Sequence, residues 1–218
     1  MDPGHIKAVT FDAGGTLIEP WPSVGDVYAR VAAEFGHSLA PAKLNAAFSS
    51  AWKRRKEFDY SLPSWRHLVE QVFVLATPLP SALFDSLYQR FAEAGAWRIH
   101  SDVTETLQAL RQRGYRMAVI SNWDERLKAL LANLRLNDYF EAIVVSVDVG
   151  ATKPAPEIFK RALQLLNLAP VEVLHIGDSI EEDFAGAHDC GLSALLLDRS
   201  GKSKEALPSL ENLLSLLH

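Results

Sequence analysis

The segment from residue 103 to residue 197 alternates between helical and extended patterns, and this alternation limits the possible folds more than any other feature. Apolar residues at helical spacing predict helices over residues 103–113, 125–134, 156–166 and 180–190. Short runs of mainly aliphatic residues predict strands over residues 117–120, 143–146, 173–176 and 194–197. Strands that alternate with helices pair in parallel, because each helix returns the chain across a face of the sheet. We therefore expect an α/β fold with a doubly wound parallel sheet.

Before this region the sequence contains one strand and then a long helical stretch. Val9 and Phe11 belong to a strand pattern, whereas residues 21–97 show helical spacing and no clear strand. A helical block inserted after the first strand of a sheet is typical of a lid, which excludes water from reacting groups. We predict a core domain formed by residues 1–18 and 99–218, with a helical cap domain formed by residues 19–98.

The first strand ends in an acid followed closely by two glycines. Gly14 and Gly15 permit a tight turn that most side chains disfavour, so the Asp12 carboxylate is expected to project from the carboxyl end of the strand. Open α/β sheets bind their ligands at that edge. An isolated Asp in this setting can also cap a turn. The choice between the two interpretations depends on residues farther along the chain.

Polar residues also follow three of the later predicted strands. Ser121 and Asn122 follow the first of these strands, Lys153 lies in the loop after the second, and Asp178 and Asp183 follow the third. Carboxylates hold Mg²⁺, whereas a lysine and a hydroxyl neutralise and orient phosphate oxygens. Each residue alone has an ordinary explanation as a helix cap or a surface side chain. Their joint recurrence at strand ends favours one metal and phosphate site, at the edge that carries the first acid.

Composition narrows the classes of partner. The 218 residues carry a formal net charge of -5 and no basic face dominates, so we expect no nucleic-acid partner. The sequence has no cationic start followed by an apolar core, and no apolar run of membrane-spanning length, so we expect no leader and no membrane anchor. The single Cys190 suits a reducing compartment. We expect a cytoplasmic protein that acts on a small molecule; the sequence carries no prediction of its oligomeric state.

Together these motifs resemble the haloacid dehalogenase superfamily of hydrolases, in the branch with a helical cap after the first strand. The family's motifs correspond, in order, to residues 12–16, to Ser121, to Lys153, and to Gly177 with Asp178 and Asp183. The closer pattern, Phe-Asp-Ala-Gly-Gly-Thr-Leu with Ser-Asn-Trp-Asp-Glu-Arg-Leu, is similar to the REG-2-like hydrolases. The resemblance implies a Rossmann-like sheet with the strand order 3-2-1-4-5.

The resemblance also implies a role for each motif residue. Asp12 is the implied nucleophile, and Lys153 is a second catalytic residue. Mg²⁺ is the implied cofactor, held by Asp12, the Gly14 carbonyl, Asp178 and Asp183. The implied phosphate-binding residues are Gly15, Ser121, Asn122 and Lys153.

Gly14 departs from the pattern of the family's phosphatases. Those relatives carry a second Asp at this position, which protonates the leaving group and then activates water. Gly14 retains a main-chain carbonyl for the metal but has no acid to offer. General acid–base assistance of this kind contributes roughly 10²- to 10⁴-fold to a rate. Glu19 and Asp124 are the two alternative acids that we consider.

Three functions fit these motifs. We favour a Mg²⁺-dependent phosphatase that hydrolyses a small phosphorylated metabolite through an aspartyl phosphate on Asp12. A 2-haloacid dehalogenase also uses an Asp nucleophile without the second Asp, but those relatives carry a bulky aromatic at the position of Gly14, need no metal and usually replace the Gly-Asp of the fourth motif. Asp178 therefore speaks against this alternative. The third possibility is a protein that binds phosphate and metal with little turnover.

Overall fold

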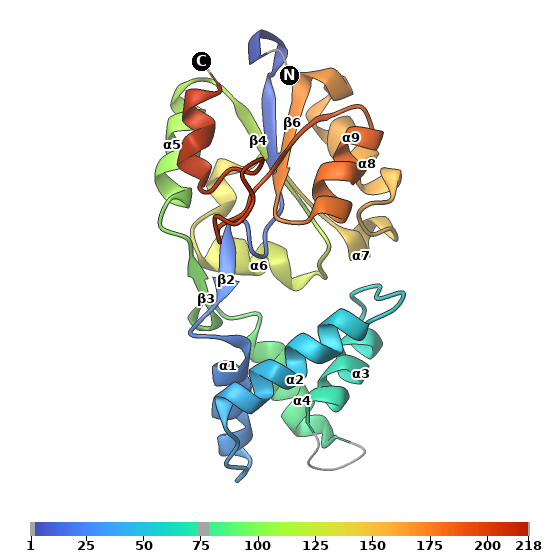
Figure 1. Cartoon of the computed structure of the whole chain (residues 1–218). Helices are drawn as coiled ribbons and strands as arrows, with labels where there is room; N and C mark the ends of the chain where they lie inside the picture. The colour runs from blue at the N-terminus through green and yellow to red at the C-terminus, as the bar shows by residue number, and fades with distance from the viewer. Residues whose placement is uncertain (1–2, 74–78, 218) are drawn as a thin grey trace. The chain divides into compact units, whose positions relative to one another are not determined.

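The computed structural model describes residues 3–73 and 79–217, which form two compact units (Figure 1). One unit consists of Met1–Ile18 together with Ile99–His218, and the other consists of Glu19–Arg98. Where the chain passes between the units, β2 (Ile18–Pro20) and β3 (Trp97–Ile99) form a two-stranded sheet. Strands of three residues are too short to produce a periodic pattern, which is why the sequence predicted none at the borders of the helical stretch.

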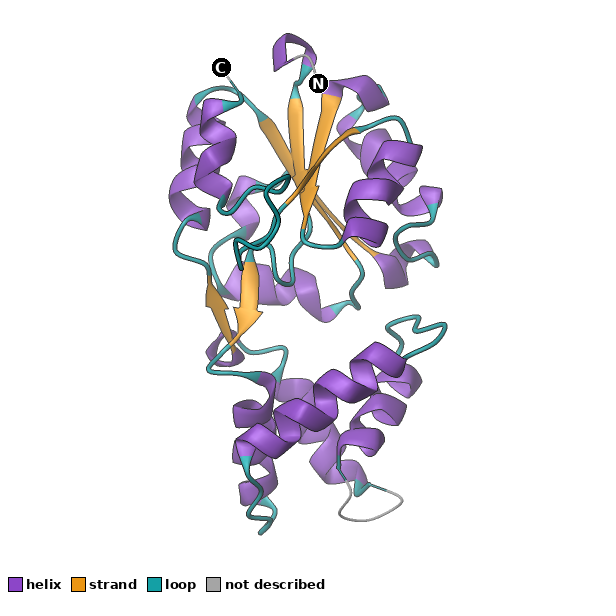
Figure 2. Cartoon of the chain, viewed as in Figure 1, coloured by secondary structure: helices purple, strands orange, loops and turns teal. Residues whose placement is uncertain are grey.

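The first unit is built on a five-stranded parallel sheet (Figure 2). Its strands are β1 (Ala8–Phe11), β4 (Arg116–Ser121), β5 (Ala142–Val145), β6 (Val173–Gly177) and β7 (Ser193–Leu196). Their order in the sheet is β5-β4-β1-β6-β7. Counted along this unit the order is 3-2-1-4-5, so the predicted topology is confirmed. The central strand β1 is buried along its whole length, and three of its four residues are apolar.

Helices lie on both sides of this sheet (Figure 2). They are η1 (Pro3–His5), α5 (Val103–Gln112), α6 (Arg126–Asn133), η3 (Asn137–Tyr139), α7 (Ser146–Val149), α8 (Pro156–Leu166), η4 (Pro170–Glu172), α9 (Gly186–Asp189) and η6 (Leu210–Ser215). The fully buried Ile158 and Phe159 of α8 belong to the same apolar cluster as Ala8 of β1. The C-terminal η6 packs against α5 (Figure 1).

The helix predicted over residues 180–190 is less regular than its pattern suggested. It begins as a π-helical turn, η5 (Ile180–Ala185), and becomes α-helical only at α9. The main-chain N–H groups of Asp183 and Phe184 both donate to the Ser179 carbonyl, at 3.1 Å each. The Asp183 carboxylate also accepts the Ser179 N–H at 3.0 Å, so its side chain is turned back towards the start of the helix. The distortion thus lies at Asp183, one of the acids that the sequence analysis singled out, and π-bulges are frequent at functional sites.

In residues 19–73 and 79–98, the second unit contains four α-helices with their own apolar core. They are α1 (Val24–Glu34), α2 (Pro41–Arg54), α3 (Leu62–Val72) and α4 (Ser81–Arg90), with the short η2 (Ala94–Ala96) before β3. Helix α1 is capped by Ser23, whose Oγ accepts the Asp26 N–H at 3.2 Å. Helix α3 is capped by Ser61, whose side chain accepts the Ser64 N–H. None of the helices in the described residues combines the length and apolar character needed to cross a membrane.

Asp102 connects three separate parts of the first unit. It precedes α5 and is almost fully buried. Its Oδ2 accepts hydrogen bonds from Arg199 Nη1 at 2.9 Å, from Ser209 Oγ at 2.8 Å and from Leu210 N at 2.7 Å. Burial alone would raise the pKa of Asp102, but the hydrogen bonds from Arg199, Leu210 and Ser209 outweigh it and lower the pKa.

We predict that this arrangement stabilises the fold at neutral pH. Because the folded-state pKa is lowered, the stabilisation is present above the unfolded pKa of about 4 and is lost as the pH falls through the folded value. Asp102→Asn should cost about 1.5–3 kcal/mol of unfolding free energy at pH 7, the usual range for hydrogen bonds to a charged group. Urea unfolding at pH 7 and pH 3 measures both effects, with the exposed Asp189→Asn as the matched control. Equal losses in the two variants would contradict the prediction.

Candidate active site

Asp12 lies directly after β1, at the carboxyl edge of the sheet. Its side chain is largely buried, and its main-chain N–H donates to the Ile176 carbonyl at 2.9 Å. The carboxylate Oδ1 accepts hydrogen bonds from Ser121 Oγ at 2.9 Å and from Lys153 Nζ at 2.7 Å. Burial raises the pKa of Asp12 above its usual value, against the opposing charge of Lys153. The first acid, the hydroxyl and the lysine of the sequence motifs therefore meet around one oxygen atom.

Lys153 has a hydrogen-bond acceptor for each of its three ammonium hydrogens. Its Nζ donates to Asp12 Oδ1 at 2.7 Å, to Asp183 Oδ1 at 2.5 Å and to the Ile120 carbonyl at 2.9 Å. Burial alone would lower the pKa of Lys153, but the two carboxylates outweigh it and raise the pKa well above its usual value. The buried Lys153 is thus a fixed positive charge between two acids.

Asn122 holds the loop that carries Lys153. Its Oδ1 accepts the Lys153 N–H at 2.6 Å, and its Nδ2 donates to the Lys153 carbonyl at 3.0 Å. The same Nδ2 donates to Glu182 Oε2 at 3.0 Å. Its side chain is therefore engaged in positioning Lys153. The expected contact between Asn122 and phosphate stays a prediction, and it would fall to the main chain of this residue.

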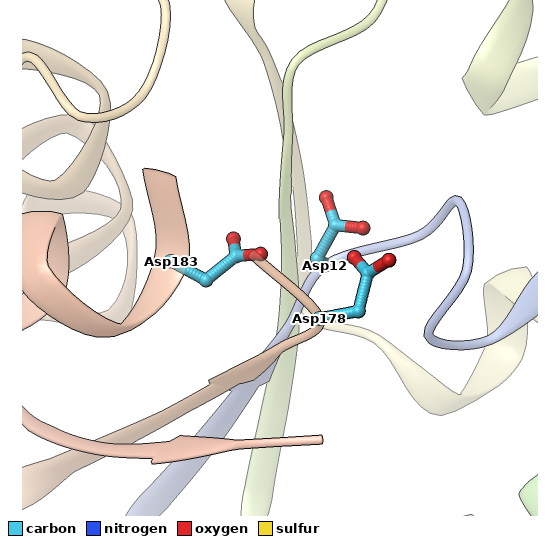
Figure 3. A group of neighbouring side chains, drawn as sticks. All are labelled: Asp12, Asp178 and Asp183. Atoms are coloured by element: carbon cyan, nitrogen blue, oxygen red, sulfur yellow. The ribbon is translucent and has the colours of Figure 1, made fainter. Parts of the chain in front are cut away.

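Three carboxylates converge at the ends of β1 and β6 (Figure 3). One oxygen from each of Asp12, Asp178 and Asp183 lies within 4.8 Å of the others. Loss of surrounding water, together with the charges of Asp12 and Asp183, raises the pKa of Asp178 to about 7. A divalent cation would relieve this repulsion, and hard oxygen ligands are the ones that Mg²⁺ prefers. The donor set therefore fits such an ion.

Two glycines allow these carboxylates to approach the main chain. A Cβ atom on Gly15, whose φ is +82°, would lie 2.4 Å from Asp178 Oδ2. A Cβ atom on Gly177 would lie 2.1 Å from the Asp183 Cγ. The Gly15 N–H already donates to the Ile18 carbonyl at 2.8 Å. What Gly15 supplies in the structure is space for Asp178, and its expected contact with phosphate stays a prediction.

The space beside Gly14 is filled by an aromatic ring that the sequence analysis did not single out. A Cβ atom on Gly14 would lie 3.1 Å from Cζ3 of Trp123. The Trp123 N–H donates to Ser146 Oγ at 3.0 Å, and its carbonyl accepts from Ser146 Oγ at 3.0 Å and from the Val147 N–H at 3.2 Å. Position 123 directly follows two motif residues, but the sequence does not show that its ring lies beside Gly14.

Neither alternative acid is placed as an obvious substitute for the one missing at Gly14. Asp124 is fully buried, and its two carboxylate oxygens accept hydrogen bonds from Arg126 Nε at 2.8 Å and Nη2 at 2.6 Å. Glu19 belongs to the second unit, where its Oε1 pairs with Arg98 Nη2 at 2.5 Å. Both carboxylates are thus engaged by arginines.

A pocket of about 260 Å³ opens beside the acidic group. Gly15 and Asp178 line one part of it, and the segment after β7 contributes Leu197, Asp198 and Arg199. Arg199 also donates to the Thr16 carbonyl at 2.7 Å, which ties this segment to the turn after β1. The pocket gives the first unit a concave surface that continues from the carboxylates.

Sequence comparisons assign this arrangement to a family. The model of haloacid dehalogenase-like hydrolases matches residues 6–191. A human haloacid dehalogenase-like hydrolase domain-containing protein 3 is 32% identical over 236 residues, which cover 98% of this chain and 94% of the relative. The rhythmically expressed gene 2 protein of Drosophila melanogaster is 30% identical over 221 residues, which cover 90% and 85% of the two chains.

Solved structures of two activities resemble the chain. A HAD phosphatase from Thermococcus onnurineus is 25% identical, with a TM-score of 0.72 and 97% coverage of both chains. A dehalogenase is 27% identical, with a TM-score of 0.73 and the same coverage. The fold is thus shared with hydrolases of both kinds. From its sheet order, its motif residues and these matches, the chain belongs to the haloacid dehalogenase-like hydrolases.

Proposed function

We propose that this hydrolase is a Mg²⁺-dependent phosphatase that acts on a small phosphorylated metabolite. The observation that carries the proposal is that Asp12 accepts hydrogen bonds from Lys153 and Ser121. It also has a carboxylate oxygen within 4.8 Å of oxygens of Asp178 and Asp183. Lys153 and Ser121 are suited to a phosphoryl group, which carries negative charge on several oxygens. The acidic group is suited to the cation that would accompany it, and Mg²⁺ would there neutralise charge on the phosphoryl oxygens.

The chemistry follows from how Asp12 is held. Its Oδ1 accepts both hydrogen bonds, so Oδ2 is the candidate attacking atom. In the first step Oδ2 forms a bond to phosphorus while the bond from phosphorus to the leaving-group oxygen breaks, and that oxygen departs with the electron pair. In the second step water attacks the aspartyl phosphate at phosphorus, which restores the carboxylate and releases inorganic phosphate. Lys153 balances charge as an ammonium ion throughout.

Trp123 restricts which side chain at position 14 could protonate the leaving group. A Cβ atom at position 14 would lie 3.1 Å from the ring, so the ring would have to shift slightly to admit an acid there. Without an acid at this position, the leaving group departs as an anion or takes its proton from water. If departure of the leaving group without a protein acid is very slow, the protein would bind phosphate and metal with little turnover, which is the third possibility.

The same ring supports a second candidate function. In the sequence, the absence of an aromatic residue at position 14 spoke against a 2-haloacid dehalogenase. Trp123 supplies an aromatic group in the corresponding space from a different loop, which weakens that objection. Asp178 still favours the phosphatase, because it adds a third carboxylate to a site that a dehalogenase would use without metal. Halide release from 2-chloropropionate in the presence of EDTA tests this alternative directly.

We also propose that the helical unit serves as a cap over the substrate and that the protein is cytoplasmic. The proposed partner is a small phosphorylated molecule, with neither nucleic acid nor membrane as a ligand. Limited proteolysis within residues 19–98, with and without a phosphate mimic, would measure whether ligand binding protects this unit. Fractionation of cells measures the location.

The first prediction concerns the metal. Millimolar Mg²⁺ should raise the melting temperature of EDTA-treated protein, because a ligand that binds only the folded state stabilises it by RT ln(1 + [L]/Kd). Asp178→Asn should remove most of this rise. Glu181→Gln is the matched control, since it removes one exposed acidic charge from the neighbouring turn while leaving the three carboxylates intact. Identical melting of the unmodified protein with and without Mg²⁺ would exclude the metal site.

The second prediction concerns Asp12. Asp12→Asn should abolish release of phosphate from p-nitrophenyl phosphate and binding of the beryllium fluoride complex that mimics an aspartyl phosphate. The variant should remain folded by circular dichroism, because the amide oxygen can still accept from Ser121 and Lys153. Asp148→Asn, in an exposed part of α7, serves as the control for charge. Residual turnover above a few per cent in carefully purified Asp12→Asn would remove Asp12 from the role of nucleophile.

The third prediction separates Gly14 from Trp123. The kcat/KM of the unmodified protein should fall steeply as the leaving-group pKa rises, so aryl and acyl phosphates should react far faster than alkyl phosphates. Gly14→Asp alone should not restore alkyl phosphate hydrolysis, because Trp123 obstructs the new side chain. Gly14→Asp combined with Trp123→Ala should accelerate alkyl phosphates by up to about 10²-fold relative to Trp123→Ala alone. A flat dependence in the unmodified protein would mean that another group already supplies the proton.

A further inference from the structure

His175 is a buried polar residue in the middle of β6. Its side chain is fully buried, and its neighbours along the strand are aliphatic residues and a glycine. Burial of an imidazole is unfavourable unless its ring nitrogens find partners. Both do: Nδ1 lies 2.9 Å from Thr10 Oγ1, and Nε2 lies 3.1 Å from Asp183 Oδ1. The ring also meets Phe159 edge-on, with centroids 5.4 Å apart, so its plane is fixed by packing as well.

The two partners determine where the hydrogens lie. An ionised Asp183 can only accept, so Nε2 must carry the hydrogen that points to it. The Thr10 hydroxyl lies 3.5 Å from the Leu174 carbonyl, at the limit of a hydrogen bond, but only 2.9 Å from Nδ1. Its hydrogen is therefore best donated to Nδ1. Thr10 thus favours the tautomer of His175 that carries its hydrogen on Nε2.

Sheet register brings this pair together. Thr10 of β1 and His175 of β6 are directly opposite one another in the parallel pairing of the two strands. Side chains at paired positions of neighbouring strands lie on the same face of the sheet. The pairing of the two buried strands therefore fixes the contact between Thr10 and His175. Thr10 lies two residues before Asp12, so the same strand supplies both the reactive carboxylate and the hydroxyl.

Asp183 links this pair to the reactive site. Its Oδ1 accepts from His175 Nε2 and also from Lys153 Nζ, while its Oδ2 accepts from the Ser179 N–H. Lys153 in turn contacts Asp12. A rotation of the Asp183 carboxylate would withdraw one of the three acceptors of the ammonium group. The position of Lys153 on Asp12 therefore depends on whether His175 presents a hydrogen to Asp183.

We propose that Thr10 and His175 form a buried positioning pair, in which Thr10 selects the His175 tautomer that holds Asp183 and Asp183 in turn keeps Lys153 on Asp12. Neither residue of the pair contacts substrate in this proposal. The contact of Lys153 with Asp12 serves a phosphatase and a dehalogenase equally. The proposal therefore stands or falls separately from the proposed function.

Nitrogen-15 NMR of metal-free protein tests the pair directly. In histidine-labelled protein, His175 should show a protonated Nε2 and an unprotonated Nδ1, with the resonance assigned from its loss in His175→Gln. In lysine-labelled protein, the Lys153 ammonium should give a signal protected from exchange, because each of its hydrogens has an acceptor. An Nδ1-protonated or doubly protonated ring in the unmodified protein would overturn the proposal without any variant of Thr10.

Thr10→Val and Thr10→Ser supply the matched comparison. Valine has nearly the shape of threonine without the hydroxyl, whereas serine keeps the hydroxyl and loses a methyl group. Thr10→Val should give a mixture of His175 tautomers and exchange of the Lys153 ammonium at least about tenfold faster than in Thr10→Ser. His175→Gln, whose amide can still donate to Asp183, should retain more of the Lys153 signal than His175→Leu. Unchanged tautomer and exchange in a folded Thr10→Val would refute the proposal, as would equal loss of the Lys153 signal in both His175 variants.

Discussion

The side chains at the carboxyl edge of the sheet are arranged around one buried ammonium group, that of Lys153. Lys153 contacts both Asp12 and Asp183, and its third hydrogen bond goes to the Ile120 carbonyl at the end of β4. Removing one partner of such a buried pair typically costs about 3–5 kcal/mol, because the remaining charge is left without compensation. The three carboxylates still exceed the one lysine charge, and desolvation together with the charges of Asp12 and Asp183 raises the pKa of Asp178.

The sequence predicted the parts of this edge that depend on strand ends. Asp12, Ser121 and Asp178 follow buried apolar runs, and parallel strands bring their carboxyl ends to one edge whatever the details of packing. Lys153 could be included because it lies in a loop at that same edge. Topology alone therefore accounts for the meeting of the motif residues, and their separation in the chain does not matter.

The remaining features depend on directions that a linear pattern does not contain. The sequence leaves open whether the Trp123 ring belongs to a core or to a surface, and only the structure places this ring beside Gly14. The role of His175 depends on strand register, which places it opposite Thr10, and an apolar strand pattern does not report register. Asn122 illustrates the same limit, since its side chain holds the Lys153 main chain. In each case the missing information is a contact between two segments that are remote in sequence.

The position of β1 in the sheet has a consequence for how the chain folds. Ala8 pairs with Arg116 on one side and with Val173 on the other, so the central strand has no neighbour until most of the chain has been made. The entropy lost on closing a loop grows with its length, and contacts this remote slow a search for the native topology. The pairing of β2 with β3 joins the two ends of the intervening helical segment. The helical segment has its own apolar core, so it can fold as a unit whose two ends are close together. The loop that must then close to pair β1 with β4 is much shorter than the number of residues between these strands.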